Sequence, residues 1–277
     1  SLIIIFATQT NSVFLTVLKL KVMMKYSLLL VMMFSLMLSS CDCGDKKTAE
    51  KETETTYDMA KYAEVKLTSD ISHLNDNQKE MLKKLFAAAD IMNEIFWLEN
   101  AGEKNAFLNS IDDLKLRRYA DINYGPWDEL NNLAPFIDGY DAKPAGAEFY
   151  PKDMTKEEFE AWENPNKTNL YTLVKRDENG NLITVWYHDA FKSHVDKASA
   201  LLLEAAALAE DKEFANYLTL RAKALQTDDY FESDMAWLSM KNNLVDIVIG
   251  PIENYTDGLY GYKAAHEGYV LIKDVVW

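Results

Sequence analysis

Near its C-terminal end the chain reads Gly250-Pro251-Ile252-Glu253-Asn254-Tyr255-Thr256-Asp257, directly after the apolar run 244–249. The apolar run predicts a strand, and the Gly-Pro pair is expected to interrupt its regularity. Because side chains two residues apart share a face of an extended backbone, Glu253 and Tyr255 are predicted to face one cavity. A carboxylate holds an ammonium group, and a phenol donates a hydrogen bond to a carbonyl oxygen or an oxyanion. The pair therefore suits recognition of a free peptide N-terminus beside a bond that is cut.

The rest of the chain mixes helical and strand patterns. Apolar residues recur at three- and four-residue spacing in 77–98, after a candidate cap at Asn75 or Asp76, and in a second helical stretch, 103–119. Further helices are predicted at 155–162, 188–210, 211–225 and 228–240. Strands are predicted at 169–174 and 182–187, around an Asn-Gly turn, and at 244–249 and 269–273. We therefore predict an α+β fold that is dominated by helices, with a hairpin and C-terminal strands.

The N-terminal region has the organisation of an export signal. Residues 1–23 read as translation upstream of the true start, which we place at Met24. Lys25 then provides a positive charge and 26–38 an apolar core of signal-peptide length, so that 24–40 is predicted to be a signal peptide. The apolar core is short for a membrane span, which needs about 20 residues.

Small residues precede Cys41 directly after this apolar core, as in the lipobox of bacterial lipoproteins. The resemblance implies that Cys41 carries a lipid and anchors the protein in the bacterial cell envelope, on its periplasmic or outer face. A cleaved secretory signal with an incidental cysteine is the alternative. Since Cys43 is the second of only 2 cysteines, a disulfide framework and a cysteine-based zinc site are excluded.

The composition divides the remainder into a tether and a folded part. Residues 41–58 are rich in charged residues and threonine and poor in apolar residues, which predicts a flexible, lipidated tether. Residues 59–277 are predicted to be part of one large domain. The apolar pattern 269–277 stops without a turn or cap, and we therefore expect the sequence to be a fragment.

The net charge of the chain is -15, and its sequence pI is near 4.7. Binding to nucleic acid phosphates needs clustered lysine and arginine side chains, and the sequence shows no such cluster. Nucleic acid is therefore excluded as an expected partner.

Six blocks of sequence resemble the dipeptidyl peptidase III family of zinc metallopeptidases, peptidase family M49, and most of all its bacterial and plant-type branch, whose plant members carry a Nudix domain. The blocks are Asn123-Tyr124-Gly125-Pro126-Trp127, Gly146-Ala147-Glu148-Phe149-Tyr150-Pro151, Asp153-Met154-Thr155-Lys156-Glu157-Glu158-Phe159, Asp229-Tyr230-Phe231-Glu232-Ser233-Asp234-Met235-Ala236-Trp237, Ile249-Gly250-Pro251-Ile252-Glu253-Asn254-Tyr255-Thr256-Asp257 and Gly261-Tyr262-Lys263-Ala264-Ala265. Their order and number make a chance match improbable.

The resemblance implies a two-lobed enzyme that releases dipeptides from peptide N-termini, with this chain as its N-terminal, truncated portion. It assigns Glu253 to binding of the substrate amine, and Tyr255 to catalysis by stabilising the tetrahedral intermediate. The family's zinc motif, two histidines and a glutamate on a helix with a second glutamate further on, is absent here. We therefore expect zinc in the intact protein, no metal site in this chain, and no hydrolysis by this chain alone. A non-catalytic, lipid-anchored peptide-binding protein remains the alternative function.

Other chemically suggestive residues have simpler interpretations. The acidic group Asp228, Asp229, Glu232 and Asp234 is interpreted as helix capping rather than as a cation site. The pairs His188-Asp189 and His266-Glu267 are interpreted as structural, because no nucleophile or second metal ligand accompanies either pair. Four tryptophans are interpreted as packing residues, with a peptide groove as the alternative: Trp127, Trp162, Trp186 and Trp237.

Overall fold

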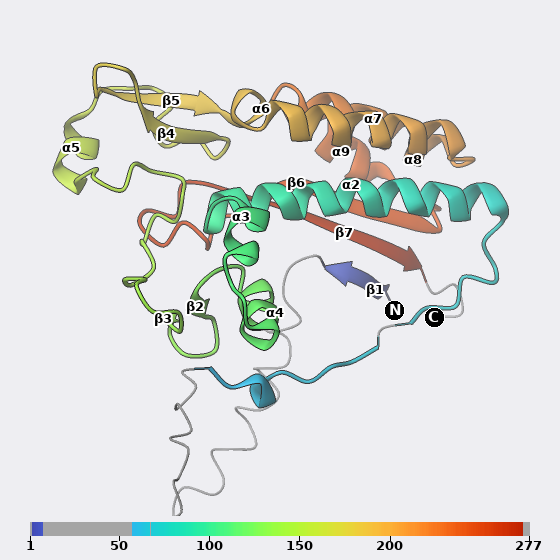
Figure 1. Ribbon diagram of the computed structural model, residues 1–277. Helices are drawn as coiled ribbons and strands as arrows, with labels where there is room; N and C mark the ends of the chain where they lie inside the picture. The colour runs from blue at the N-terminus through green and yellow to red at the C-terminus, as the bar shows by residue number, and fades with distance from the viewer. Residues whose placement is uncertain (1, 8–56, 67, 274–277) are drawn as a thin grey trace, which may run out of the picture.

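The computed structural model describes residues 2–7, 57–66 and 68–273, with only the backbone of 2–7 (Figure 1). The predicted signal peptide, Cys41, most of the tether and the last residues of the chain lie outside the described residues. The predictions made for those segments therefore remain predictions. Among the residues that are described, no helix is both long enough and apolar enough to span a bilayer.

Helices and small antiparallel sheets alternate along the chain. The helices are η1 (Met59–Lys61), α2 (Asp76–Asn100), α3 (Lys104–Asn109), α4 (Leu114–Ile122), α5 (Lys156–Ala161), α6 (Tyr187–Ala190), α7 (Lys192–Leu208), α8 (Lys212–Leu225) and α9 (Phe231–Ser239). The strands are β1 (Leu2–Ala7), β2 (Trp127–Asp128), β3 (Ala134–Pro135), β4 (Thr172–Arg176), β5 (Leu182–Trp186), β6 (Val245–Glu253) and β7 (Ala265–Lys273). The predicted class, a helix-rich α+β fold, is confirmed.

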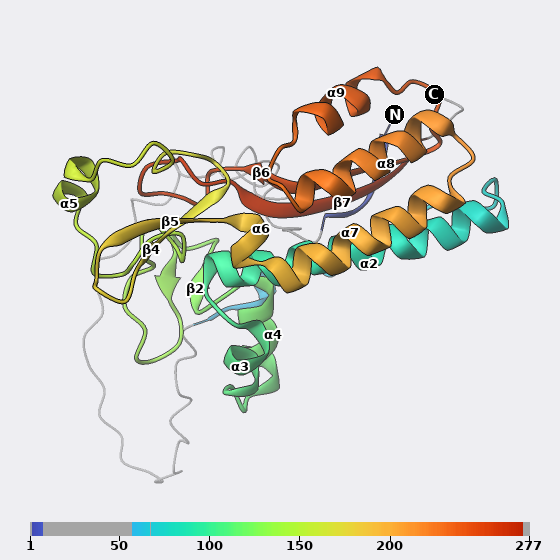
Figure 2. The ribbon, with the colours of Figure 1, turned by 90° about the horizontal axis from the view of Figure 1, so that it is seen from above.

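Helix α2 forms where the apolar periodicity predicts it. Asn75 caps its first turn and Gln78 completes a capping box, which satisfies two backbone N–H groups that have no partner within the helix. Its buried stripe includes Leu85, Met92 and Ile95, each fully inaccessible to solvent. Figure 2 shows α7 lying alongside α2, and α8 alongside α7, above the sheet that contains β6 and β7.

The prediction of a single helix over 103–119 is wrong. The helix stops at Asn109, where the Ser110 hydroxyl donates to the carbonyl oxygen of Phe107, and a new helix begins at Leu114. The carboxylate of Asp113 accepts hydrogen bonds from two N–H groups of this new helix and so caps it. Apolar periodicity continues across the break, and periodicity alone does not reveal a capping residue in its middle.

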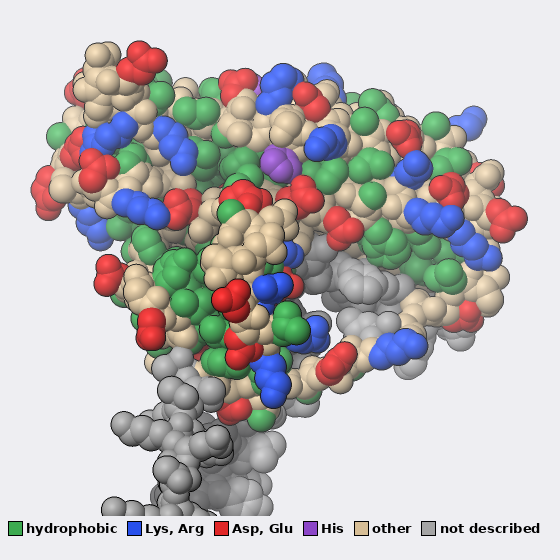
Figure 3. All heavy atoms as spheres, in the orientation of Figure 1, with side chains coloured by type: hydrophobic (Ala, Val, Ile, Leu, Met, Phe, Trp, Pro, Cys, Tyr) green, Lys and Arg blue, Asp and Glu red, His purple; other side chains and the backbone are tan. Residues whose placement is uncertain are grey.

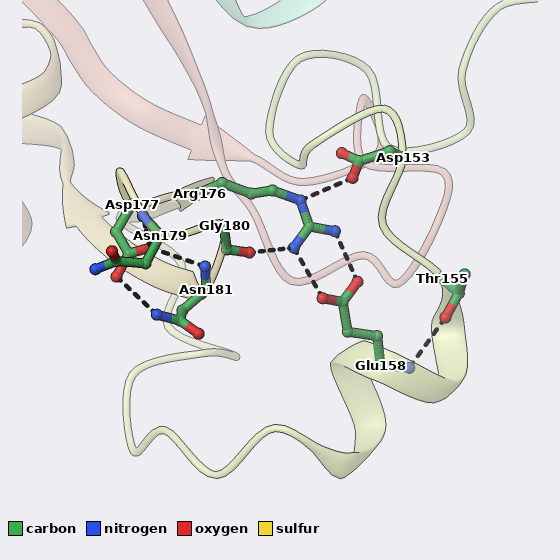
Figure 4. Close-up of polar contacts among 8 residues, drawn as sticks. All are labelled: Asp153, Thr155, Glu158, Arg176, Asp177, Asn179, Gly180 and Asn181. Atoms are coloured by element: carbon green, nitrogen blue, oxygen red, sulfur yellow. Dashed lines mark hydrogen bonds and ion pairs between the residues drawn. The ribbon is translucent and has the colours of Figure 1, made fainter.

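The hairpin β4–β5 pairs Thr172 with Trp186 and Arg176 with Leu182, as the Asn-Gly turn predicts. Arg176 fastens it to the preceding segment (Figure 4). Its guanidinium donates two hydrogen bonds of 2.8 Å to the Glu158 carboxylate on α5 and one of 2.8 Å to Asp153. The hairpin and α5 are therefore held together by one side chain.

The principal sheet has the strand order β1-β7-β6, and both pairings are antiparallel. Helix α2 covers one of its faces so closely that a Cβ atom on Gly268 of β7 would lie 2.8 Å from Ala89. Strands β6 and β7 are both longer than predicted, because β6 continues through the Gly-Pro pair to Glu253 and β7 begins at Ala265. On the face of the molecule drawn in Figure 3, acidic and basic side chains are interspersed.

Candidate functional site

The end of β6 contains an irregularity that redirects Glu253. Gly250 lies opposite Glu267 and Pro251 opposite His266, but Glu253 lies opposite Ala265, so that Ile252 is an extra residue on β6. Side chains alternate between the faces of a strand, and one inserted residue exchanges the faces beyond it. The bulge therefore moves Glu253 from the α2-facing side, where Ile247 and Ile249 are buried, to the side that carries Gly250 and Glu267.

Glu267 and Tyr269, two residues apart on β7, share this second face with Glu253. The Tyr269 hydroxyl donates a 2.6 Å hydrogen bond to Oε2 of Glu267, whose side chain is buried. The other carboxylate oxygen, Oε1, is buried without a hydrogen-bond partner. Burial, with a smaller effect of the Glu253 carboxylate, raises the pKa of Glu267 to about 7. The far side of the sheet thus holds a carboxyl group that is readily protonated near neutral pH.

Tyr255 lies in a turn beyond the strand, not on an extended backbone as the spacing argument assumed. The N–H of Asp257 donates to the carbonyl oxygen of Asn254 at 3.2 Å and closes this turn. Desolvation of its hydroxyl raises the pKa of Tyr255, and the carboxylates of Glu267 and Glu253 raise it further. The turn therefore brings Tyr255 into the electrostatic neighbourhood of both glutamates, while 59% of the residue remains exposed.

A cavity of about 340 Å³ opens beside this cluster, between β6, α8, α9 and the start of β4. Its walls include Arg221, Tyr230, Trp237, Leu238, Val248 and Ile252. Neither Glu253 nor Tyr255 lines it, although Glu253 directly follows Ile252 in the chain. This cavity is therefore not the one that Glu253 and Tyr255 were predicted to share, and that prediction stays untested.

The acidic residues around the start of α9 have mixed roles, since the Asp229 carboxylate accepts from the N–H of Phe231 at 3.4 Å while Asp228 and Asp234 form side-chain pairs. Both the N–H and the ring Nδ1 of His188 lie within hydrogen-bonding distance of Asp228 Oδ2, at 3.1 and 2.8 Å. Asp234 forms an ion pair with Arg221. The N-cap of α9, Tyr230, makes no side-chain capping bond. The capping interpretation is therefore wrong for Asp228, whereas Asp234 lies in the first turn of α9, where a carboxylate complements the helix dipole.

The metal-ligand prediction can be tested against the residues that the structure describes. Among them, no group of three or more histidine, cysteine, aspartate or glutamate side chains lies close enough to hold a metal ion. His266 is instead enclosed, with its Nδ1 atom 2.7 Å from Oε1 of Glu99 and both side chains fully buried. The residues described here do not fit a zinc ion, and no chemical step is derived through one.

Comparison with known proteins gives this geometry a context. No family model matches the chain. The curated protein Nudix hydrolase 3 of Arabidopsis thaliana is 28% identical, over 78% of this chain and 36% of that protein. The solved structure of DPP III from Caldithrix abyssi is 36% identical with a TM-score of 0.71, over 75% of this chain and 42% of that one. DPP III here stands for dipeptidyl peptidase III. The resemblance to the dipeptidyl peptidase III family is confirmed.

A second solved dipeptidyl peptidase III, from Corallococcus sp. strain EGB, is 32% identical with a TM-score of 0.73, over 78% of this chain and 42% of that one. The chain thus spans less than half the length of each of these relatives. The fold described above is accordingly similar to part of the dipeptidyl peptidase III fold.

The sequence-based interpretation missed Glu267 and Tyr269 as members of the cluster. The sequence did contain a signal for them, because Glu267 and Tyr269 have the same spacing of two residues as Glu253 and Tyr255 and lie within an apolar strand pattern. Reading His266 and Glu267 as one unit concealed it, because neighbouring residues on a strand point to opposite faces.

Proposed function

We propose that this chain forms the part of a dipeptidyl peptidase that binds the amino end of a peptide substrate. The observation that carries the proposal is the similarity to two solved dipeptidyl peptidase III structures at 36% and 32% identity. The influence of the Glu253 carboxylate on the pKa of Tyr255, just beyond the end of β6, supports it. In the intact protein, zinc would supply the activated water for hydrolysis.

Each proposed role follows from the local chemistry. Glu253 is exposed at the end of its strand, so its carboxylate is accessible to an ammonium group from solvent. A tyrosine hydroxyl is protonated at neutral pH, and desolvation and two carboxylates raise the pKa of Tyr255 further. A protonated phenol is a hydrogen-bond donor, which is what a developing oxyanion requires.

Binding of the substrate amine can be tested on this chain directly. We expect the tetrapeptide Ala-Ala-Ala-Ala to bind with a dissociation constant that calorimetry measures, and its N-acetylated form to bind at least about tenfold more weakly. Glu253→Gln should weaken binding of the free peptide by a similar factor, whereas Glu213→Gln, an exposed site on α8, should not. Equal affinity for the free and acetylated peptides would contradict the proposal.

Catalysis is tested in the full-length protein that contains the remaining part of the family fold. Glu253→Ala should mainly raise KM, because it removes binding of the amine in both ground and transition states. Tyr255→Phe should lower kcat by about 10²–10³-fold, the usual effect of losing one oxyanion donor. Unchanged kinetics in both variants would refute these assignments.

We further propose that Cys41 carries the lipid that anchors the protein in the bacterial cell envelope. The support is the small-residue motif after the apolar segment. Metabolic labelling with a palmitate analogue should mark the protein in bacterial cells, and Cys41→Ala should abolish the label. Labelling that persists in the variant would exclude Cys41.

A further inference from the structure

We propose that Asp257 is a positioning residue for Tyr255, because its buried carboxylate holds the loop from which the Tyr255 side chain projects. The loop comprises residues 254–264 and joins β6 to β7. The proposal rests on the proposed function, since it takes Tyr255 as the donor to the oxyanion. It adds a residue that acts on turnover through another side chain.

Asp257 is 2% exposed, and its carboxylate accepts five hydrogen bonds from residues that the structure describes. Four of the donors are backbone N–H groups of the same loop, and the fifth is the hydroxyl of Tyr150, at 2.7 Å. Because hydrogen bonds to a carboxylate are stronger than those between neutral groups, this side chain fixes the course of the loop. The backbone donors are those of Leu259, Tyr260, Tyr262 and Lys263, at 3.1, 3.1, 2.8 and 3.1 Å.

Tyr255 lies between two fixed points of the backbone. On one side, Glu253 pairs with Ala265 in the antiparallel register of β6 and β7. On the other side, the N–H of Asp257 donates to the carbonyl oxygen of Asn254 at 3.2 Å and closes the turn that contains Tyr255. Only three residues separate Glu253 from Asp257. The position of Asp257 therefore determines where the Tyr255 side chain leaves the backbone.

The Tyr255 ring depends on this backbone support more than a buried ring would. The residue is 59% exposed, so packing restricts its side chain less than that of a core residue. Displacement of a catalytic group by about 1 Å can lower a rate about 10²-fold. A shift of the loop at Asp257 should therefore cost turnover through Tyr255.

The loop is also attached to parts of the fold outside β6 and β7. Tyr150, which donates to Asp257, belongs to the segment before α5 and is 5% exposed. Lys263 is fully buried, and its Nζ atom donates to the carbonyl oxygens of Lys167 and Asn169, each at 2.9 Å, in the segment between α5 and β4. The carboxylate of Asp257 thus refers the Tyr255 turn to a rigid surrounding.

The test is a double-mutant cycle in the full-length protein, with release of Ala-Ala from tetra-alanine as the assay. Asp257→Asn keeps the shape of the side chain but replaces one acceptor oxygen with an NH2 group, so that part of the hydrogen-bond set is lost. We expect kcat to fall about tenfold and KM to change less than about threefold, because strand pairing holds Glu253. In the Tyr255→Phe background the same substitution should lower kcat by less than about twofold, since the group that it positions has been removed.

Asp177→Asn is the matched control. The Asp177 carboxylate organises the loop between β4 and β5 in the same way, since it accepts from the N–H groups of Asn179 and Asn181 at 2.9 and 2.8 Å (Figure 4). This loop carries neither Glu253 nor Tyr255. The control should leave kcat and KM unchanged in both backgrounds, and a fall in kcat equal to that of Asp257→Asn would overturn the proposal.

Failure of the proposal and failure of the proposed function give different results. If Tyr255→Phe itself leaves kcat unchanged, the catalytic role of Tyr255 fails and the positioning role fails with it. If Tyr255→Phe lowers kcat but Asp257→Asn lowers it equally in both backgrounds, or not at all, the positioning role is overturned and the proposed function stands.

Tyr150→Phe repeats the cycle if circular dichroism shows that Asp257→Asn does not fold. It removes the phenolic donor and leaves the backbone donors of the Asp257 carboxylate in place. Here kcat should fall about threefold with the native Tyr255 and remain unchanged with Tyr255→Phe. Falls of equal size in both backgrounds would again overturn the positioning role.

Discussion

His266 and Glu267 are adjacent residues on β7, and they have opposite environments. His266 faces α2, where its ring and its backbone N–H both contact the carboxylate of Glu99 at 2.7 and 2.8 Å, with both side chains fully buried. Glu267 faces the other side, where it accepts from Tyr269 and lies near Glu253 and Tyr255. The strand separates a sealed structural pair from a titratable cluster next to the proposed substrate site.

The difference shows that adjacent histidine and glutamate residues in a strand face opposite sides of the sheet and have to be interpreted separately. The interpretation of the pair as structural agrees with the environment of His266, but the position of Glu267 beside Glu253 connects it with the candidate site. The two sides also predict different behaviour. Loss of a contact on the α2 side should cost stability, whereas changes on the far side should alter pH dependence.

The largest effect is expected from Glu99→Ala. Removing one partner leaves His266 buried without its carboxylate, and broken buried pairs typically cost about 3–5 kcal/mol. Urea unfolding followed by circular dichroism measures this loss. Glu94→Ala on the same helix is the control, because the Glu94 side chain is 60% exposed and lies 3.7 Å from His194. The control should lose less than about 1 kcal/mol. Equal losses would contradict the distinction between the two environments.

Gly250→Ala should rank second, with a loss of about 2–3 kcal/mol in the free energy of unfolding. Gly250 lies opposite Glu267, has a φ of 126°, and an added Cβ would lie 3.3 Å from the Tyr230 ring. Two contributions are expected, backbone strain from the positive φ and a close contact of the added Cβ. Gly139→Ala separates them, since Gly139 has a φ of 88° with no atom within 4 Å of an added Cβ. The same urea experiment applies, and a loss at Gly250 no greater than at Gly139 would exclude a packing contribution.

Glu267→Gln should change the pH dependence of stability. The pKa of Glu267 is raised from 4.5 to about 7 in the folded protein, so the folded state retains a proton that the unfolded state has released. Its contribution is therefore complete below about pH 4.5 and is lost as the pH rises to about 7. The native protein should lose at most about 3 kcal/mol relative to Glu267→Gln across this window, the free-energy equivalent of the pKa shift. Urea unfolding at several pH values measures the difference, and parallel profiles would refute the prediction.

Tyr269→Phe should have the smallest effect of the four, about 1 kcal/mol at neutral pH, because it removes one hydrogen bond to the Glu267 carboxylate. The lost bond also favours the ionised form of Glu267, so the pKa of Glu267 should rise further in the variant. The descending part of the stability profile should then move to higher pH. Tyr140→Phe, at a 42% exposed position, should leave the profile unchanged. A shift to lower pH would contradict the assigned donor.

Much of the fold could be predicted from the sequence because its helices and its hairpin are stabilised by interactions between residues close in the chain. The apolar spacing and the capping box at Asn75 and Gln78 determine α2, and the Asn-Gly turn determines the β4–β5 hairpin. The break between α3 and α4 escaped prediction, since it depends on the single cap Asp113 within a continuous apolar pattern. The length of β6 also escaped, because pairing with β7 extends a strand across a Gly-Pro pair that would end it in isolation.

The candidate site was predicted in part. The sequence pointed to Glu253 and Tyr255, and the Glu253 carboxylate is one of the charges that raise the pKa of Tyr255. The roles assigned to the two residues stay predictions. The reason given was incomplete, because Tyr255 occupies a turn and Glu253 reaches its face through a bulge. The pairing register between β6 and β7 decides where the bulge and the end of β6 lie. These two strands are joined by the loop 254–264, and the spacing of Glu253 and Tyr255 does not predict the geometry of that loop.

The sequence by itself determined most of the helices and strands of this protein, its acidic character and the resemblance to dipeptidyl peptidase III, and it supplied the prediction that Glu253 and Tyr255 act together. These follow from periodicity, turn chemistry and motif order, all of which act between residues close in the chain. Only the tertiary structure decided that Glu267 faces the site while His266 does not, and that a cavity lies beside Ile252. The first depends on which face of β7 meets α2 and the second on how α8 and α9 pack beside β6, and contacts between residues up to 167 positions apart fix this arrangement.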